Sequence, residues 1–288
     1  MPPQPVKPKK SLGQNFLSDS NIARKIASQL KPSEDDIVFE IGPGMGALTQ
    51  VLLESKAILH CFEIDLQAIE FLNEKFPESI RNCLFINRKD ILELDFEKYI
   101  TENNITRKIK VIGNIPYNIS SQILFLILEN KDYIEKAILT VQKEVALRLT
   151  APTHTKEYGI TTVAVNLLGK VRRKFDIPPS CFYPKPKIMS TVIEISFKLD
   201  SIDTDTFFNI MKLIRAGFNQ RRKKLSNSLE NYFRENIKFE IREFIAHSKQ
   251  IGFDWFSKRA EQLTETEYLK LFKLINEYRT KKIRYEIE

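Results

Sequence analysis

Hydrophobic positions in the first 200 residues alternate between short apolar runs and amphipathic stretches. The apolar runs have the length of strands and span residues 37–41, 57–63, 83–87, 110–113 and 137–142. Between them, apolar residues recur with the period of a helix over 22–30, 48–53, 66–76 and 119–128. Strands that alternate with helices in this way predict an α/β fold, with a mostly parallel sheet covered on both faces.

The pattern changes further along the chain. Residues 171–177 and 191–197 are rich in β-forming residues and flank a proline-rich segment, Pro178–Pro186, so we expect a hairpin at the edge of the sheet. From there on, apolar residues recur at helical spacing, first over 207–218 and then over 263–275.

These patterns predict the division of the chain into domains. We expect an α/β domain over residues 11–200 and a small all-α domain over residues 201–288. Residues 1–10 contain several prolines and lysines and little that can pack. For them we expect a flexible basic arm.

Composition excludes several classes of protein. Of the 288 residues, 42% are hydrophobic and 28% are charged, so the chain can bury a core and is not intrinsically disordered. The longest obvious apolar run, Ile123–Leu128, is far shorter than the roughly 18 residues of a membrane span, and the N-terminus lacks an apolar signal-peptide core. Three widely spaced cysteines form neither a disulfide framework nor a metal-ligand pattern. We expect a cytoplasmic protein with no membrane partner and no metal.

A glycine-rich turn, Gly42-Pro-Gly-Met-Gly46, joins the first predicted strand to the helix after it. Gly42, Gly44 and Gly46 allow the backbone to approach a ligand closely and to take unusual angles. Taken alone, such a turn also occurs as a simple tight connection between a strand and a helix.

Three carboxylates strengthen the case for a ligand at this turn. Glu40 lies inside the apolar strand just before it, where a charged side chain needs a reason. Glu63 ends the next strand, about 20 residues on, where an acid can chelate ribose hydroxyls. Asp90 follows the third strand, where its oxygen can accept from an adenine amine. Together they predict a pocket for an adenosine-containing cofactor. The glycine spacing differs from the dinucleotide fingerprint and favours S-adenosylmethionine.

The fourth strand is followed by Asn114-Ile115-Pro116-Tyr117. The Asn114 side-chain oxygen and the Ile115 carbonyl can accept the two hydrogens of an adenine amine, Pro116 can stiffen the loop and Tyr117 can stack on the base. No general base is needed, since the rate comes mainly from positioning. Phe182 supplies a second ring for a flipped base. The alternatives are an Asn-Pro turn with a packing Tyr and a proline-rich edge loop with a core Phe.

Positive charge is concentrated toward the C-terminus. The chain has 45 Lys and Arg against 37 Asp and Glu, a formal net charge of +8, and residues 201–288 hold 18 basic against 13 acidic residues. The four consecutive cations Arg221–Lys224 repel one another, and binding to a phosphate backbone would relieve that repulsion. The alternative is that they form the solvated start of a helix and bind nothing. RNA is a better expectation than duplex DNA, because unpaired bases in RNA loops are accessible. The residues that we expect to contact RNA are Arg172, Arg173, Lys185, Lys187, Arg221, Arg222, Lys223 and Lys224.

Taken together, these motifs resemble the ribosomal RNA adenine dimethyltransferase family. The similar segments, in order over roughly residues 8–275, are Lys10–Leu17, Glu40–Thr49, Asn114–Tyr117, Gln142–Glu144, Tyr158–Gly159, Phe182–Lys187, Phe218–Lys223 and Arg259–Leu263.

The resemblance implies both a fold and an activity. The fold is a Rossmann-like, seven-stranded, S-adenosylmethionine-dependent methyltransferase sheet followed by a small helical domain. The activity is the dimethylation of two adjacent adenosines in a hairpin loop near the 3′ end of small-subunit ribosomal RNA, coupled to biogenesis of that subunit. The implied partner is the precursor subunit with its RNA, and the enzyme is expected to be a monomer.

The resemblance also assigns roles to individual residues. For the target base they are Asn114, Tyr117 and Phe182. For the cofactor they are Gln14, Asn15 and Leu17 in the N-terminal segment, Gly42 in the loop, Glu63, Asp90 and Asn114. We also expect Ile64 and Ile91, which directly follow the two acids, to contact the cofactor.

Two other functions stay open at this point. The string Asn-Ile-Pro-Tyr-Asn-Ile-Ser is similar to that of the methyltransferases that modify large-subunit RNA and confer macrolide-type antibiotic resistance. The family also includes mitochondrial transcription factors, so a non-catalytic role in binding nucleic acid is the alternative from another class. The glycine loop and the segment Asn-Gln-Arg-Arg-Lys-Lys-Leu favour the small-subunit branch, and the intact Asn-Ile-Pro-Tyr favours catalysis.

Overall fold

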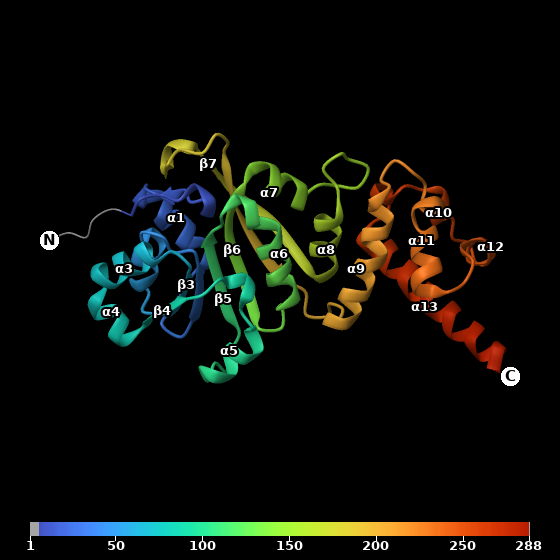
Figure 1. The fold of residues 1–288 in the computed structure, drawn as a ribbon, viewed down its shortest axis with the longest axis horizontal. Coiled ribbons are helices and arrows are strands. Elements are labelled where there is room, and N and C mark those ends of the chain that lie inside the picture. The colour runs from blue at the N-terminus through green and yellow to red at the C-terminus, as the bar shows by residue number, and fades with distance from the viewer. Residues whose placement is uncertain (1–5, 288) are drawn as a thin grey trace. The chain divides into compact units, whose positions relative to one another are not determined.

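The computed structural model describes residues 6–287, with side chains for all of these but 80, 81 and 283–287 (Figure 1). The chain divides into two compact units. The first consists of Met1–Ala146 and Lys170–Phe197, and the second of Leu147–Gly169 and Lys198–Glu288. Residues 147–169, which the sequence patterns placed in the first domain, therefore pack with the C-terminal helices instead.

The first unit is built on a seven-stranded sheet in the order β4-β3-β2-β5-β6-β9-β7. Five neighbouring strands are parallel, and β9 runs antiparallel to β6. The strands are β2 (Ile37–Ile41), β3 (Ile58–Glu63), β4 (Leu84–Arg88), β5 (Ile109–Asn114), β6 (Ile134–Gln142), β7 (Gly169–Ile177) and β9 (Ser190–Phe197). The predicted α/β fold with a mostly parallel sheet is confirmed.

The order of the strands creates a switch point between β2 and β5. From β2 the chain continues to β3 and β4 on one side, and β5 and β6 lie on the other. Ile41 at the end of β2 pairs with Gly113 near the end of β5. Ligands of such sheets bind in the crevice outside the carboxyl ends of the strands at this point.

Helices cover both faces of this sheet. Asp19 caps α1 (Ser20–Leu30), accepting from the backbone N–H groups of Asn21 and Ile22. The buried side chains of α1 and of α2 (Ala47–Leu53) form one apolar cluster with β2, β3, β5, β6 and β9. On the opposite face, Phe39 of β2 packs against Phe96 of α5 (Phe96–Glu102), with ring centroids 6.0 Å apart. The remaining helices of this unit are α3 (Leu66–Lys75), α4 (Pro77–Asn82) and α6 (Ser120–Glu129).

The proline-rich segment lies between two strands of an edge hairpin, as predicted. Asp176 of β7 accepts from Thr191 of β9, and Lys174 contacts Glu194, so the two strands run in opposite directions. Within the segment, β8 (Phe182–Tyr183) pairs antiparallel with β1 (Phe16–Leu17). The sequence patterns missed this two-stranded ribbon, which ties the N-terminal segment to the proline-rich one.

The predicted basic arm is wrong for the part of it that the structure describes. Val6 is buried in a small cluster with Phe16 and Ala68, and Lys9 forms an ion pair with Asp65. Residues 1–5 of the predicted arm lie outside the described residues. The N-terminal segment is therefore part of the fold from Val6 onward.

The second unit is helical. It contains α8 (Ile160–Leu168), α9 (Thr204–Asn219), α10 (Leu225–Ser228), α11 (Glu230–Tyr232), α12 (Ile241–Gln250) and α13 (Glu265–Ile287), while α7 (Lys143–Leu149) crosses the boundary. Tyr158 explains why the segment before α8 belongs here, since it is 1% exposed and donates to the Leu263 carbonyl. Within residues 6–287, no helix is both long enough and apolar enough to cross a membrane.

Short 3₁₀ and π turns complete the chain. In the first unit the 3₁₀ turns are Lys10–Leu12, Ile91–Glu93, Tyr117–Ile119 and Pro179–Cys181. In the second unit they are Trp255–Ser257 and Ala260–Gln262, with a π-helical turn over Phe233–Ile237.

Candidate active site

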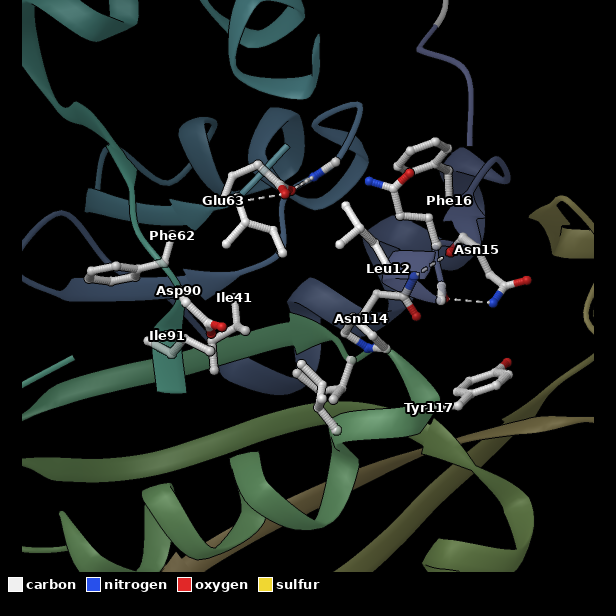
Figure 2. A pocket seen from close by; sticks show the side chains of 18 of the residues that line it. Leu12, Asn15, Phe16, Ile41, Phe62, Glu63, Asp90, Ile91, Asn114 and Tyr117 are labelled. Carbon is white, nitrogen blue, oxygen red and sulfur yellow. Dashed lines mark hydrogen bonds between the residues drawn. The ribbon is translucent and has the colours of Figure 1, made fainter. Parts of the chain in front are cut away.

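A cavity of about 690 Å³, counted out to its open mouth, lies at the carboxyl ends of β2, β3 and β5 (Figure 2). Twelve residues that the sequence analysis singled out line it. They are Gln14, Asn15, Gly42, Gly44, Glu63, Ile64, Asp90, Ile91, Asn114, Ile115, Pro116 and Tyr117.

Several wall residues were not anticipated. They are Leu12, Gly13, Phe16, Ile41, Phe62, Lys89 and Ile119. Most are apolar, so their side chains alone do not indicate a binding site. Ile41 and Phe62 could have been found from their positions, because each directly precedes a predicted site residue.

Glu63 presents a carboxylate that the backbone holds in place. Its Oε1 accepts from the N–H groups of Ile64 at 2.9 Å and Asp65 at 3.0 Å, and its Oε2 accepts from Gly44 at 3.1 Å. The residue is 6% exposed. Burial raises the pKa of Glu63, and the three backbone hydrogen bonds oppose that rise. The carboxylate is thus fixed in orientation at the cavity wall and can accept from two adjacent hydroxyls.

Asp90 lies at the far end of the cavity, where the structure places it directly after β4 and Lys89. Its Oδ1 caps the turn Ile91–Glu93 by accepting from Leu92 N at 2.9 Å. Its Oδ2 makes no hydrogen bond to any described residue, so one acceptor stays available to a ligand.

The glycine turn is shaped by packing as well as by ligand access. Gly44 has φ = +54°, and a Cβ there would lie 2.7 Å from the Phe16 ring. Gly46 has φ = +72°, and a Cβ there would meet Phe76 at 2.7 Å. Both positions therefore require glycine. Gly46, predicted as a cofactor residue, does not line the cavity and serves the contact of the turn with α3.

Glu40 also has a different place from the one predicted. It is 1% exposed and lies beneath the turn, where it and Leu17 border a smaller hollow. Its Oε2 accepts from Thr49 Oγ1 at 2.7 Å and from the Cys61 thiol at 3.6 Å. Burial raises the pKa of Glu40 to about 7. Glu40 thus ties β2 to α2 under the turn and does not line the larger cavity, so its direct contact with a cofactor stays a prediction.

Asn114 closes the other side of the cavity (Figure 2). Its Nδ2 donates to the backbone carbonyl of Asn15 at 2.7 Å. Since an amide is planar, its Oδ1 lies on the opposite edge, and this oxygen makes no hydrogen bond to any described residue. Ile115 follows at the cavity wall, and its N–H donates to the Thr140 carbonyl. Asn114 and Ile115 thus lie in succession in the cavity wall at the end of β5.

Tyr117 is held by hydrogen bonds at both ends. Its hydroxyl lies 2.7 Å from Ser190 Oγ at the start of β9, and Ser120 Oγ donates to the Tyr117 carbonyl at 3.1 Å. Burial raises the pKa of Tyr117. The ring lines the cavity as a half-buried flat surface.

Phe182 does not reach the cavity. It is 2% exposed and belongs to the apolar cluster under α1 and α2, because β8 pairs with β1 and places Phe182 beside Leu17. Its ring does not line the cavity in this structure, so its role in holding the target base stays a prediction. The Phe is a core residue, as the alternative stated above had it.

The predicted RNA-binding residues differ in how free they are. In the first unit, Arg173, Lys185 and Lys187 are exposed, and Arg172 contacts Glu194 at 3.1 Å. Burial tends to raise the pKa of Glu194, but its hydrogen bonds with Arg172 and Lys174 lower it overall.

The four-cation cluster belongs to the second unit. It lies in the turn between α9 and α10 rather than at the start of a long helix. Arg222, Lys223 and Lys224 are exposed. Arg221 instead donates to the Thr155 carbonyl at 2.9 Å and lies 3.7 Å from Glu261. Arg221 therefore holds the unit together, and the other three are the exposed cations of the cluster.

The buried Glu40 predicts a dependence of stability on pH. Its pKa is about 7 in the fold against an ordinary 4.5, so the folded state retains a proton that the unfolded state has lost between these values. Its contribution is complete below pH 4.5 and is lost as the pH rises through 7. We expect Glu40→Gln to reduce the fall in the free energy of unfolding over this range by about 1–3 kcal/mol.

Urea unfolding from pH 5 to pH 8 measures this effect. Glu34→Gln is the matched control, because Glu34 is exposed, and it should keep the wild-type profile. An unchanged profile in Glu40→Gln would mean that Glu40 does not bind the proton.

Comparisons with known proteins agree with this geometry. The sequence model of a family described as "Ribosomal RNA adenine dimethylase" matches residues 6–276. The "Ribosomal RNA small subunit methyltransferase A" of Syntrophus aciditrophicus is 42% identical over 229 residues, 78% of this chain and 80% of that protein. The protein of the same name from Salinibacter ruber is 39% identical over 270 residues, 93% of this chain and 84% of that one.

A solved structure shows the same fold. The crystal structure of a dimethyladenosine transferase from Plasmodium falciparum superposes with a TM-score of 0.76 at 26% identity, covering 91% of this chain and 98% of that one. The matched region includes both units described above. With the cavity at the switch point of a methyltransferase-like sheet, these matches show that the chain belongs to the ribosomal RNA adenine dimethylase family.

Proposed function

We propose that this protein transfers methyl groups from S-adenosylmethionine to the exocyclic amines of two adjacent adenosines, two to each, in a hairpin loop near the 3′ end of small-subunit ribosomal RNA. The observation that carries the proposal is the Asn114 amide, fixed by the Asn15 carbonyl with its oxygen unpaired at the cavity wall. The relatives named for the small subunit support the choice of RNA. The substrate is the precursor subunit in the cytoplasm, and the enzyme acts as a monomer.

The residues of the cavity fit the adenosine part of this cofactor. The Glu63 carboxylate, oriented by three backbone N–H groups, accepts from the ribose hydroxyls. The Asp90 Oδ2 accepts from the adenine amine, and Ile64 and Ile91 supply apolar walls for the base. Gly42 and Gly44 let the backbone approach the cofactor.

The target amine is activated by the loop after β5. An adenine exocyclic nitrogen is a poor nucleophile because its lone pair is delocalised into the ring. The Asn114 Oδ1 and the Ile115 carbonyl accept its two hydrogens, which favours a pyramidal nitrogen and turns the lone pair away from the ring. Pro116 stiffens the loop, and Tyr117 stacks on the base with its ring held by Ser190.

The transfer itself needs little more than position. When bound, S-adenosylmethionine supplies a methyl group on a positively charged sulfur. The nitrogen lone pair forms the new N–C bond while the S–C bond breaks and its electron pair stays on sulfur. The methylated amine is strongly acidic and releases its proton to water, so none of the cavity residues has to act as a tuned base. The residues act by alignment.

A subunit-specific assay tests this function. Small subunits from a strain that lacks the modification are incubated with the protein and S-adenosylmethionine carrying a labelled methyl group. We expect label in dimethyladenosine of the small-subunit RNA. Label only in large-subunit RNA would select the antibiotic-resistance activity, and binding without label would select a non-catalytic role; either result contradicts the proposal.

The role of Asn114 gives a sharper prediction. Asn114→Ala removes the oxygen that accepts from the amine, so we expect methylation to fall by roughly a hundredfold to a thousandfold, as when a preorganised polar group is removed elsewhere. Binding of S-adenosylhomocysteine should weaken only a few fold. Asn73→Ala, an exposed asparagine on α3, is the control and should methylate normally. Equal activity of the two variants would refute the polarising role.

The three exposed cations of the turn between α9 and α10 should bind phosphates. We expect the combined change of Arg222, Lys223 and Lys224 to Gln to weaken RNA binding and to flatten its dependence on salt by about 0.7–0.9 per lost contact. Lys270, Lys273 and Lys281 changed together to Gln on α13 provide a control of equal charge in the same unit. A triple variant with the wild-type salt slope would show that the cluster is only a solvated surface.

A further inference from the structure

Asp65 connects the cofactor-binding strand to the N-terminal segment. It follows β3 directly after Glu63 and Ile64 and is 1% exposed. Its Oδ1 accepts from Lys9 Nζ at 2.6 Å, and its Oδ2 accepts from Gln14 Nε2 at 2.8 Å. Asp65 also caps α3, since Oδ1 accepts from Gln67 N at 3.1 Å. One buried carboxylate thus holds two residues that lie more than 50 positions earlier in the chain.

The N-terminal segment is closed on itself by a further hydrogen bond. The backbone N–H of Lys9 donates to Gln14 Oε1 at 2.7 Å. Both ends of the Gln14 amide are therefore used within the protein, one toward Lys9 and one toward Asp65. The turn Lys10–Leu12 is enclosed between these contacts. We call residues 9–17 the strap.

The other half of the strap lies against the reactive loop. A Cβ on Gly13, which has φ = +64°, would lie 2.8 Å from Asn118 Oδ1. The Asn15 carbonyl accepts from Asn114 Nδ2 at 2.7 Å, and Phe16 and Leu17 are fixed by pairing with β8. Figure 2 shows Leu12, Asn15 and Phe16 on the side of the cavity that also holds Asn114. The strap is therefore both a wall of the cavity and a support of the loop.

The contact between Asn15 and Asn114 decides which way the Asn114 amide faces. A carbonyl oxygen can only accept, so it can pair with Nδ2 and not with Oδ1. A flipped amide would bring two acceptors together at 2.7 Å. With Nδ2 turned to the strap, Oδ1 is left to accept from a ligand. The orientation of the catalytic amide consequently depends on where the strap holds the Asn15 carbonyl.

We propose that Asp65 is a positioning residue for methyl transfer: by holding Lys9 and Gln14 it fixes the strap, and the strap orients the Asn114 amide and completes the wall of the cofactor cavity. This inference rests on the proposed function of the site. It assigns Gln14 to the strap rather than to the cofactor. It also explains how one segment affects both cofactor binding and methyl transfer. Displacement of the strap changes the wall of the cofactor cavity and the orientation of the Asn114 amide. We call the contacts of Asp65 with Lys9 and Gln14 the clasp. The Lys9 side chain is 43% exposed, so the clasp can open at modest cost.

Lys9→Met is the variant that opens the clasp, and Lys7→Met is its matched control. Lys7 is exposed, lies two residues away and loses the same charge in the same segment. Without any ligand, we expect faster hydrogen exchange over residues 10–17 in Lys9→Met and wild-type exchange in Lys7→Met. By calorimetry, Lys9→Met should bind S-adenosylhomocysteine about tenfold more weakly.

Kinetics separate positioning from mere holding. At saturating S-adenosylmethionine, we expect kcat on small subunits to fall severalfold in Lys9→Met, because the Asn114 amide is no longer aligned. Asp65→Asn keeps the size of the side chain but removes the charge and turns an amide nitrogen toward one of its present donors, so it should impair binding and kcat at least as much. The double variant should lose less than the two single losses combined, since both changes act on the contacts of one carboxylate. Lys9→Arg should restore both binding and kcat.

Two outcomes contradict the inference. Wild-type exchange, affinity and kcat in Lys9→Met would remove the clasp altogether. Weaker binding with an unchanged kcat at saturation would leave the strap as a wall only and refute the positioning role. If the wild-type protein labels no adenosine, the proposed function fails, while hydrogen exchange and S-adenosylhomocysteine binding still decide whether Asp65 holds the strap.

Discussion

The site depends on the contact between the ends of β2 and β5. Parallel pairing places Ile41 beside Gly113, so the glycine turn and the Asn114 loop leave the sheet next to each other. The approach is close enough that a Cβ on Gly113 would lie 2.7 Å from the Ile41 carbonyl. On the proposed function, one loop supplies backbone for the cofactor and the other supplies acceptors for the amine. Their separation is set by the hydrogen-bonded ladder of the two strands.

Three carboxylates lie around this junction, and they differ in their hydrogen-bond partners and in the direction in which their pKa is shifted. Glu40 is desolvated under the turn and has a pKa of about 7. Glu63 is also buried, but three backbone N–H groups point at its oxygens. Burial also disfavours the charged form of Asp65, yet its hydrogen bonds from Lys9 and Gln14 lower its pKa overall. Glu40 therefore ties two elements together, Asp65 holds the N-terminal segment, and Glu63 keeps an oriented carboxylate at the cavity wall.

The sequence predicted the sheet and the residues with distinctive chemistry better than it predicted orientation. Glu63, Asp90 and Asn114 stand where strand ends were expected, because strand length and loop position follow from hydrophobic patterning. Glu40 and Phe182 were assigned to ligands but turn inward, since which face of a strand is buried depends on partners far away in the chain. For Phe182 that partner is β1, a two-residue strand. Such a short pairing leaves no periodic signal.

The same reasoning explains the second unit. Tyr158 and Arg221 form contacts inside it that hold the segment before α8 to the C-terminal helices. Neither contact follows from hydrophobic spacing. The sequence patterns therefore placed the domain boundary near residue 200 and could not assign residues 147–169 to the C-terminal domain. Arg221 was predicted to contact phosphate because it belongs to a basic run. In the structure it lies beside Glu261 and stabilises the second unit. Charge in a sequence indicates a partner class, and only the fold decides which cations are available to that partner.

The distribution of charge within the cavity matches the chemistry of the two reactants. Glu63 and Asp90 line the half that follows β3 and β4, whereas the loop after β5 presents Asn114, Ile115 and Tyr117, which carry no charge. On the proposed function, the two carboxylates accept from the hydroxyls and the amine of the adenosine part of the donor, and the uncharged loop accepts from the target amine. The acids are therefore placed for the cofactor, and the neutral acceptors hold the amine without placing a carboxylate beside it.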